Sequence, residues 1–530
     1  FYAIYHGPEG LKKIARRIWL LRQTLVRCLK WCGIEVVDGD GFDTVKFKSI
    51  RMIDGYNVTI KNGWTTLSVD ETTTFETIYS IINSQVSFDS SKTTVISVWD
   101  SCVDDMWSNI PPRSKPWLEQ EVFHKYRSET NLMRYIHELE SKDFSLINGM
   151  MPLGSCTMKL NSAAELTPVS WEEFANVHPH TPPGQIQGYD RMIKDLTEWL
   201  CDLTGFHSMT FQPNSGAQGE YAGLLAIRDY HESKADFKRN VCLIPESAHG
   251  TNPASAVMAG MKVVGIKCDS EGNIDIHDLR LKACLEANEL AALMITYPST
   301  HGVYEQNIKE ICSIVHEFGG QVYMDGANFN AQVGLCQPGE FGVDVAHLNL
   351  HKTFCIPHGG GGPGVGPIGV AEHLAPFIDQ KVSAAEHGSA SILPIVWMYI
   401  RMMGEDGLRN ATEVALLNAN WLAKKIDPHF KVLYKGKDGW VAHECIFDCR
   451  NMAANAEDVA KRLMDYGFHA PTLSWPVSGT MMVEPTESES LDELQKFVDA
   501  MAKIRKEIAE LPAILKLSLI HISEPTRLEP

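Results

Sequence analysis

The chain has 530 residues, of which 44% are hydrophobic, and a formal net charge of −18 at pH 7. A chain of this length exceeds what one hydrophobic core usually holds, so the sequence predicts a globular protein of two or three domains. The negative charge argues against nucleic acid and anionic membrane surfaces as binding partners. No apolar run approaches the roughly twenty residues that a membrane-spanning helix needs.

Thirteen cysteines are scattered along the chain, without a CxxC pair or a histidine spacing that suits zinc. We therefore expect no metal site, and we interpret the cysteines as mostly buried thiols in a reducing compartment. The chain begins at Phe1, inside what the sequence indicates is a continuing domain. Any targeting segment would then lie upstream, and we expect the mitochondrial matrix for a eukaryotic source or the cytoplasm for a bacterial one.

The first part of the chain indicates a small α+β unit. Apolar residues at helical spacing predict a helix over residues 10–32, which ends at a glycine. Alternating runs at 45–48 and 56–60 predict short strands, and two consecutive prolines then suggest a boundary. We assign residues 1–111 to this domain.

Apolar stripes predict two more helices, one within residues 121–142 with Ser128 as its N-cap, and one over residues 189–203. We expect both helices to pack against a core through these stripes.

From Ser208 onward, short apolar runs alternate with helical stretches. This alternation predicts an α/β domain over residues 121–427, with a mostly parallel sheet and helices on both faces. The expected strands are 209–211, 241–244, 263–266, 292–297, 321–324 and 343–350.

Beyond Pro428 the elements become shorter and predict a separate α+β domain over residues 428–511. Residues 512–530 look like translated adapter sequence, so we leave this tail out of the predicted fold as non-native. The expected elements of the small domain are strands 431–434, 444–449 and 480–483 and helices 456–466 and 491–508.

Lys352 directly follows the strand expected at 343–350, and parallel strands present ligand sites at their C-terminal ends. The glycine-rich run Gly359–Gly364 comes next and would let the backbone approach a ligand closely. This setting is typical of pyridoxal-phosphate enzymes, in which the lysine carries the cofactor as a Schiff base. A surface lysine at a strand end is the alternative. We also expect Asn349 and His351, beside the lysine, to bind the cofactor.

Three other segments offer the remaining groups that such an enzyme needs. Ser215, Gly216 and Ala217 lie where a strand leads into a helix, whose N-terminal amides suit a phosphate, although capping alone would explain them. Asp325 ends a buried strand and can pair with a protonated pyridine nitrogen, or it can simply cap a turn. His249 is expected to stack on the cofactor ring, or to be a surface-loop histidine. Their order on successive strand ends predicts a fold-type I pyridoxal-phosphate enzyme.

Four longer motifs resemble those of the glycine decarboxylase family, the P-protein of the glycine cleavage system. The resemblance extends along residues 121–508 and is specific, because motifs of this length rarely coincide. The motifs are PLGSCTMKLN at 152–161, ESAHGTNPAS at 246–255, LNLHKTFCIPHGGGGP at 348–363 and HGSASILP at 387–394.

The resemblance implies pyridoxal-phosphate-dependent decarboxylation of glycine. In that reaction glycine displaces Lys352 from the cofactor, the carboxylate leaves as CO2, and the carbanion is delocalised toward Asp325. The aminomethyl group then passes to the lipoyl arm of a partner H-protein. Lys352, His249 or a nearby cysteine could move protons. We interpret Cys156 and Cys355 as buried structural thiols, because a reactive cysteine requires a lowered pKa.

The family is built from two related halves, of which only the C-terminal half carries the lysine, and the full-length protein is expected to be a homodimer. By this resemblance residues 1–111 are a remnant of the first half, most of which lies outside the chain. Two alternatives stay open. One is another fold-type I decarboxylase or aminotransferase, and the other is a fragment that binds the cofactor without turnover.

Overall fold

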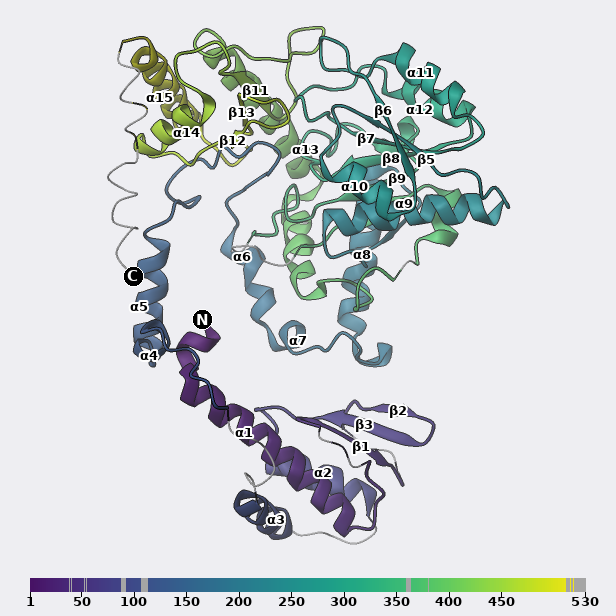
Figure 1. The fold of residues 1–530 in the computed structure, drawn as a ribbon, viewed down its shortest axis with the longest axis vertical. Coiled ribbons are helices and arrows are strands. Elements are labelled where there is room, and N and C mark those ends of the chain that lie inside the picture. Colours follow the sequence, from purple (N-terminus) through teal and green to yellow (C-terminus); the bar gives the residue numbers. More distant parts are fainter. Residues whose placement is uncertain are drawn as a thin grey trace. The chain divides into compact units, whose positions relative to one another are not determined.

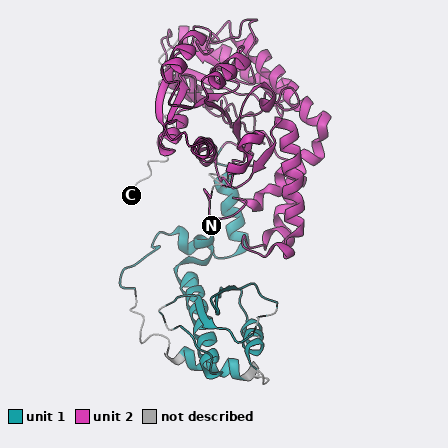
Figure 2. Cartoon of the chain, turned by 90° about the vertical axis from the view of Figure 1, so that its right-hand side faces the viewer, with its two compact units in different colours: residues 1–143 teal, residues 144–530 magenta. Residues whose placement is uncertain are grey.

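A computed structural model describes two compact units, residues 1–143 and 144–530, which have different colours in Figure 2. Each unit has its own hydrophobic core. Three sequence features fall outside the described residues, namely the glycine run at 359–363, the proline boundary at 111–112 and most of the tail. The described residues are 1–37, 39, 41–51, 53, 55–86, 92–105, 113–358, 364–379, 381–510, 515 and 518.

The first unit packs helices against a three-stranded antiparallel sheet with the strand order β1-β3-β2. The predicted helix 10–32 is confirmed, but it begins earlier and is broken at Gly7, where φ is 57°. Side chains of this helix, such as Leu25, and of the sheet, such as Phe47, form the core. The elements are α1 (Tyr2–Trp31), β1 (Thr44–Lys48), β2 (Thr59–Lys61), β3 (Trp64–Ser68), α2 (Phe75–Gln85) and α3 (Lys92–Asp105).

Two more helices complete this unit, α4 (Val122–Lys125) and α5 (Glu129–Glu140). Ser128 caps α5 as predicted, since its hydroxyl accepts a hydrogen bond from the amide of Asn131 at 3.3 Å. The prediction that this helix packs against a core is wrong. None of its residues is buried and Met133 is 70% exposed, because no other described element of its own unit covers its apolar stripe. The unit continues to residue 143, since α4 packs against α1.

The second unit contains, within the described residues, a seven-stranded sheet with the order β4-β10-β9-β8-β7-β5-β6. Six of these strands run in one direction and β10 runs against them, which confirms the predicted mostly parallel sheet. The sequence pattern does not predict β10, because its three residues lie in a run rich in glycine and proline. The strands are β4 (Ser208–Thr210), β5 (Val241–Pro245), β6 (Lys262–Ile266), β7 (Leu290–Thr296), β8 (Gln321–Gly326), β9 (Val345–Leu348) and β10 (Ile368–Val370).

Helices cover both faces of this sheet (Figure 1). Successive residues of a strand point to opposite faces, so Leu243 packs in the core with α8, α11 and α12, whereas Cys242 packs in the core with α9 and α10. The predicted helix at 189–203 is confirmed, and it ends at Gly205, where φ is 72°. The helices are α8 (Gln187–Thr204), α9 (Gly216–Ser233), α10 (Thr251–Met258), α11 (Ile276–Leu285) and α12 (Ile308–Glu317).

The C-terminal part of the second unit is an antiparallel sheet with the order β11-β13-β12, packed against helices. The predicted strand 431–434 is reduced to one bridge between Val432 and Phe447, flanked by the bonds from the Leu433 amide to Ile446 O and from the Asp448 amide to Lys431 O, both 2.8 Å. The elements are α13 (Leu393–Ile426), β11 (Cys445–Asp448), α14 (Ala456–Asp465), β12 (Thr472–Leu473), β13 (Thr480–Val483) and α15 (Leu491–Glu510).

Shorter helical segments connect these elements. They are α6 (Ala163–Leu166) and α7 (Glu172–Ala175), and the 3-10 turns Thr167–Ser170, Pro183–Gln185, Pro338–Phe341, Glu372–Phe377 and Ala390–Ile392.

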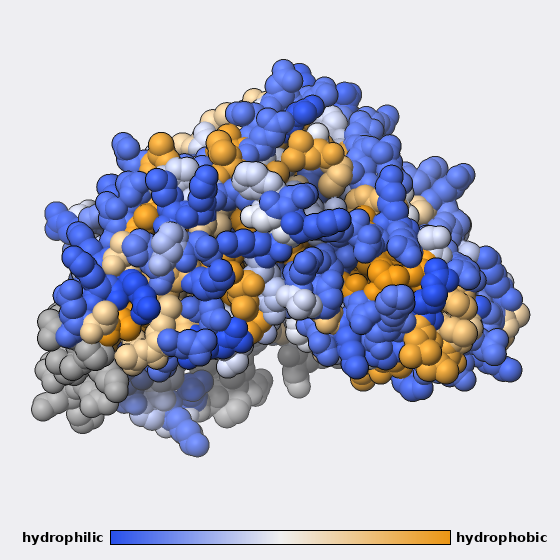
Figure 3. Space-filling view, turned by 90° about the horizontal axis from the view of Figure 1, so that it is seen from above, coloured by the Kyte–Doolittle hydropathy of each residue, from blue (hydrophilic) through white to orange (hydrophobic). Residues whose placement is uncertain are grey.

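The surface drawn in Figure 3 is mostly hydrophilic, and its apolar residues gather in separate patches. Among the described residues, no helix is long and apolar enough to cross a membrane.

Candidate active site

The predicted site residues lie on segments that follow four strands of the large sheet. Ser215 follows β4, His249 follows β5, Asp325 lies near the end of β8 and Lys352 follows β9. These strands share one direction, so their C-terminal ends meet at the same edge of the sheet, where open α/β sheets bind ligands. The topology therefore brings the four segments together.

Lys352 lies in a tight turn of residues 349–356, which we call the lysine turn. The amide of Lys352 donates to Asn349 O at 2.9 Å, and the amide of Cys355 donates to Lys352 O at 3.3 Å. Cys355 has a left-handed φ of 64°, which is uncommon for a residue other than glycine. The amide of Phe329 donates to Thr353 Oγ1 at 3.0 Å and ties the turn to the segment after β8.

Asp325 is only 4% exposed, yet its surroundings favour the charged form. Its carboxylate accepts hydrogen bonds from the amide of Ala327 at 3.0 Å and from Asn252 Nδ2 at 3.2 Å. Burial would raise the pKa of Asp325, but His347, the Ala327 amide, Lys352 and Asn252 together outweigh burial and lower that pKa. Asp325 is therefore an ionised carboxylate within electrostatic range of the lysine.

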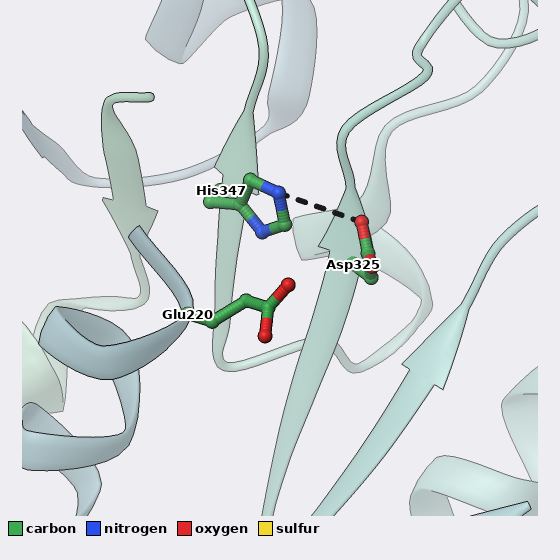
Figure 4. A group of neighbouring side chains, drawn as sticks. All are labelled: Glu220, Asp325 and His347. Carbon is green, nitrogen blue, oxygen red and sulfur yellow. Dashed lines mark ion pairs between the residues drawn. The ribbon is translucent and has the colours of Figure 1, made fainter. Parts of the chain in front are cut away.

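His347, on β9, contacts both Asp325 and Tyr323, and Figure 4 shows its ring directed toward the Asp325 carboxylate. Its Nε2 is 3.5 Å from Asp325 Oδ1, and its Nδ1 is 2.5 Å from the Tyr323 hydroxyl. An ionised carboxylate only accepts hydrogen bonds, so Nε2 faces Asp325 as a donor, and Nδ1 faces the tyrosine hydroxyl. Burial raises the pKa of Tyr323 and keeps that hydroxyl protonated.

Glu220, on α9, is the third member of this buried group (Figure 4). Its carboxylate accepts hydrogen bonds from Thr251 Oγ1 at 2.6 Å and from Ser255 Oγ at 2.5 Å. Thr251 Oγ1 is also 2.7 Å from His249 Nδ1, and the His249 ring lies edge-on to Trp475 with 5.3 Å between ring centroids. Glu220 and Trp475 thus hold the His249 loop in place.

The turn from β4 into α9 is built closely against β9. Ser215 Oγ accepts from the amide of Gln218 at 3.2 Å as the N-cap of α9, and a serine hydroxyl in this role can still donate its own proton. A Cβ atom at Gly216 would lie 2.9 Å from Asn349 Oδ1 and 3.1 Å from His347 Nε2, so a side chain there would displace its neighbours. Ala217 follows in the first turn of the helix.

The residues present fit a bound polar ligand. Among the described residues, Asn349 Oδ1, His351 Nδ1 and Asn252 Oδ1 are buried without a hydrogen-bond partner. Such atoms are costly unless a ligand or water satisfies them. Burial and then the charge of Lys352 lower the pKa of His351 to about 4, so this ring is neutral. An ionised aspartate, a lysine, a helix N-terminus and unsatisfied polar atoms at one sheet edge suit pyridoxal phosphate.

The two cysteines near the lysine differ in burial. Cys355 is buried, and burial raises the pKa of its thiol to about 12. Cys156 is only half-buried, so the expectation of a buried thiol is wrong there, and its Sγ lies 3.7 Å from His358 Nδ1. Burial raises the pKa of the Cys156 thiol, and this effect is larger than the opposite effect of the positive charge on Lys352. Neither thiol has the lowered pKa of a reactive cysteine.

A second group of buried titratable side chains has no counterpart among the predicted site residues. His443, Glu444 and Glu484 lie at the ends of β11 and β13 with their polar atoms within 4.8 Å of one another. Glu444 accepts from the amide of Ser155 at 2.6 Å, and Glu484 accepts from Asn328 Nδ2 at 3.0 Å and from the Thr157 hydroxyl. The signal that could have found the two glutamates is a charged residue at the start of the predicted strand 444–449 and another directly after the predicted strand 480–483.

The fold defines the class of protein. Solved structures with this fold include glycine decarboxylase (P-protein) of the glycine cleavage system in inhibitor-bound form, with a TM-score of 0.61 and 16% identity over 77% of this chain and 94% of that chain. Sphingosine-1-phosphate lyase from Burkholderia pseudomallei has a TM-score of 0.58 and 13% identity over 81% and 99% of the two chains. The chain has the fold of the fold-type I pyridoxal-phosphate-dependent enzymes.

Sequence comparison then identifies the family. A family model described as glycine cleavage system P-protein matches residues 91–381, and one described as glycine dehydrogenase, C-terminal domain, matches residues 411–515. Proteins named glycine dehydrogenase (decarboxylating) are 56% identical over 544 residues in Parasynechococcus marenigrum and 54% over 545 residues in Nostoc punctiforme. The chain belongs to the glycine cleavage system P-protein family. Each alignment covers 96% of this chain and 56% of the relative, so the chain spans little more than half the relatives' length.

We predict that Gly216→Ala weakens cofactor binding, because the added Cβ would push Asn349 and His347 out of place. Overpacking of this kind costs about 1–3 kcal/mol, so the dissociation constant for pyridoxal phosphate should rise about tenfold or more. Gly188→Ala is the matched control, since a Cβ there meets nothing within 4 Å. Fluorescence titration with the cofactor measures both variants, and equal affinities would contradict the tight packing at Gly216.

We predict that Glu484 makes the protein less stable as pH rises. Burial raises the pKa of Glu484 above its usual value, despite bonds from Thr157 and Asn328 and the charges of Lys352 and Lys159. Between the unfolded value and the higher folded pKa the folded state binds more protons than the unfolded state, so stability falls with rising pH. His443, whose pKa burial lowers, acts in the opposite direction, so a variant is needed to isolate the glutamate.

Glu484→Gln keeps an acceptor for Thr157 and Asn328 but removes the titration, so urea midpoints of this variant should fall less between about pH 5 and 8 than those of the unchanged protein. Glu457→Gln, at an exposed position on α14, is the control and should leave the slope unaltered. Parallel profiles for the Glu484 variant and the unchanged protein would show that this carboxyl does not titrate as described.

Proposed function

We propose that this chain binds pyridoxal phosphate through Lys352 and carries the site of glycine decarboxylation. In this reaction the substrate loses its carboxylate as CO2 and its aminomethyl group passes to the lipoyl arm of an H-protein. Membership of the P-protein family supports the choice of substrate and partner. The observation that carries the proposal is Asp325, a buried carboxylate kept ionised by its neighbours and within electrostatic range of Lys352.

Each predicted residue has a chemical task in this proposal. Ser215, Gly216 and Ala217 would hold the phosphate with the hydroxyl and amides of the α9 N-terminus. Asp325 would accept a hydrogen bond from the protonated pyridine nitrogen and keep it charged, and His249 would lie against the ring. When bound, the cofactor supplies an electron sink for the carbanion that remains after loss of CO2.

The polar atoms around Lys352 would complete the binding site. Asn349 Oδ1 and His351 Nδ1 are acceptors without a partner among the described residues, so donors on the cofactor or substrate would satisfy them. Neutral His351 would not repel the lysine, because its lowered pKa keeps the ring uncharged at neutral pH. Homodimerisation of the whole protein, and its compartment, stay predictions.

Glycine–bicarbonate exchange with a lipoylated H-protein tests the proposed reaction. Label from bicarbonate should enter the glycine carboxylate, because the exchange runs decarboxylation in reverse. Product analysis separates the alternatives: an amine or keto-acid product from another amino acid would indicate a different decarboxylase or an aminotransferase. Cofactor binding without exchange would indicate a fragment that does not turn over, and this outcome has weight because the chain spans 56% of the relative from Parasynechococcus marenigrum.

We predict that Lys352→Ala abolishes covalent attachment of pyridoxal phosphate, because this residue is the lysine of the turn that follows β9. Borohydride reduction followed by peptide mapping should place the label on Lys352 in the unchanged protein and leave the variant unlabelled. Lys496→Ala, an exposed lysine on α15, is the control and should be labelled normally. Label on another lysine would refute the assignment.

We predict that Asp325→Asn binds the cofactor but loses most decarboxylation. A neutral amide no longer stabilises a charged pyridine nitrogen, and loss of such a preorganised electrostatic contact costs on the order of 2.7–4 kcal/mol in the barrier, or about 100–1000-fold in turnover. Asp499→Asn, on the exposed face of α15, is the control. Turnover close to that of the unchanged protein would leave Asp325 as a turn cap only.

A further inference from the structure

Lys159 is a buried lysine outside the predicted site that reaches the lysine turn directly. It is only 7% exposed, and its ammonium group donates to Thr353 O at 2.8 Å, one residue after Lys352. The same group lies 2.6 Å from Glu487 Oε1, and 5.6 Å from the centre of the Tyr399 ring. Lys159 thus connects the lysine turn with α13 and with the segment between β13 and α15.

A second donor from the same segment supports this contact. Asn161 Nδ2 donates to Cys355 O, so residues 159 and 161 bond to two carbonyl groups of the lysine turn, those of Thr353 and Cys355. The left-handed φ of 64° at Cys355 is unfavourable for a cysteine and persists only where surrounding contacts hold it. The 159–161 segment therefore acts as a brace on the backbone of the turn.

The charge of Lys159 fixes the geometry of this brace. Burial alone would lower its pKa, but attraction to Glu487, followed by smaller effects of its other neighbours, outweighs burial and raises that pKa, so the group stays an ammonium ion. A buried ammonium without its partner is strongly destabilising, so Lys159 and Glu487 must keep their contact in the folded state. Asn330 Nδ2 also donates to Glu487 at 3.4 Å, which anchors the carboxylate from the segment after β8.

We infer that Lys159 is a positioning residue for Lys352: the Lys159–Glu487 ion pair holds the lysine turn so that the Lys352 amine meets the cofactor aldehyde. This inference rests on the proposed function. The amine and the aldehyde form a C=N bond and release one water, and small displacements of one reacting group slow such a step strongly. Lys159 acts through the turn and does not itself contact the reacting atoms.

The experiment compares covalent and non-covalent cofactor binding. Stopped-flow absorbance follows attachment of pyridoxal phosphate to Lys352, and a titration with pyridoxamine phosphate, which lacks the aldehyde, reports the pocket alone. Lys159→Met should slow attachment about tenfold or more, because the turn loses its brace, while the affinity for pyridoxamine phosphate is unchanged. A residue that only supports the fold would change both measurements together or neither, and either result would overturn the inference.

Two further variants make the result interpretable. Lys159→Met/Glu487→Gln leaves no buried unpaired charge, so it should fold, and it should still attach the cofactor slowly because Thr353 O lacks its donor. Arg462→Met is the matched control. This variant removes the 2.9 Å ion pair between Arg462 and Glu507, which also lies in the C-terminal part of the second unit but does not contact the lysine turn. The rate of cofactor attachment should therefore be unchanged.

The outcomes separate the inference from the proposed function. If the unchanged protein attaches no cofactor at Lys352, the proposed function fails and the inference fails with it. If the unchanged protein attaches the cofactor and both Lys159 variants do so at the same rate, only the inference is overturned. Slow attachment in both variants, with the Arg462 variant unaffected, supports it.

Discussion

Asp325 carries a negative charge inside the protein, and a buried charge costs several kcal/mol unless its neighbours compensate it. The compensation comes from three separate elements, with Asn252 on α10, His347 on β9 and the backbone amide of Ala327 after β8. Asp325 and His347 are paired residues in the β8–β9 register. A slip of that register by one residue would turn His347 to the other face of the sheet and leave the carboxylate uncompensated. The site therefore depends on the exact pairing of two central strands.

The sequence predicts the framework of the site because the framework follows from local patterns. No tertiary contact is needed to recognise apolar strand runs, their alternation with helices or the polar residues at the strand ends. These patterns predict Lys352, Asp325 and Ser215 as site residues. His347 is missed, because a histidine within a buried strand has no local sign of the side chain that it will face. Lys159 lies within a recognisable motif, yet its partner Glu487 is far away in the sequence, and only the folded chain brings them together.

Element boundaries fail where tertiary contacts override the local pattern. The helix α5 forms as predicted, but the spacing of its apolar residues predicts only a helix and does not indicate which element packs against them. The run at 431–434 has strand-like composition, yet it pairs with β11 only around Val432. β10 is too short to be recognised and owes its conformation to pairing with β9 and β4. The outcome at β10 and at 431–434 therefore depends on pairing with other strands, and the outcome at α5 depends on the lack of a covering element among the described residues of its unit.

The C-terminal part of the second unit has a fold of its own and also contributes to the site. Trp475 contacts His249, Glu444 and Glu484 contact the segment before Lys159, and Glu487 holds Lys159 itself. The two family models match residues 91–381 and 411–515, and α13 begins in the interval between them. A domain boundary placed in that interval would divide residues that lie together in one site of the folded chain.

α13 has a consequence for how the second unit comes apart. The first half of this helix, including Leu393 and Tyr399, packs in the core of the large sheet, and its second half, including Ala419 and Ile426, packs in the C-terminal core. The helix is broken at Gly404, where φ is 63° and ψ is −176°, but Leu408 beyond the break still packs in the core of the large sheet. If the C-terminal core unfolded, the second half of α13 would lose its packing partners, while the first half still packs against the large sheet. We therefore expect the two cores to unfold as one cooperative unit, so that the stability of both protects the lysine turn from local opening.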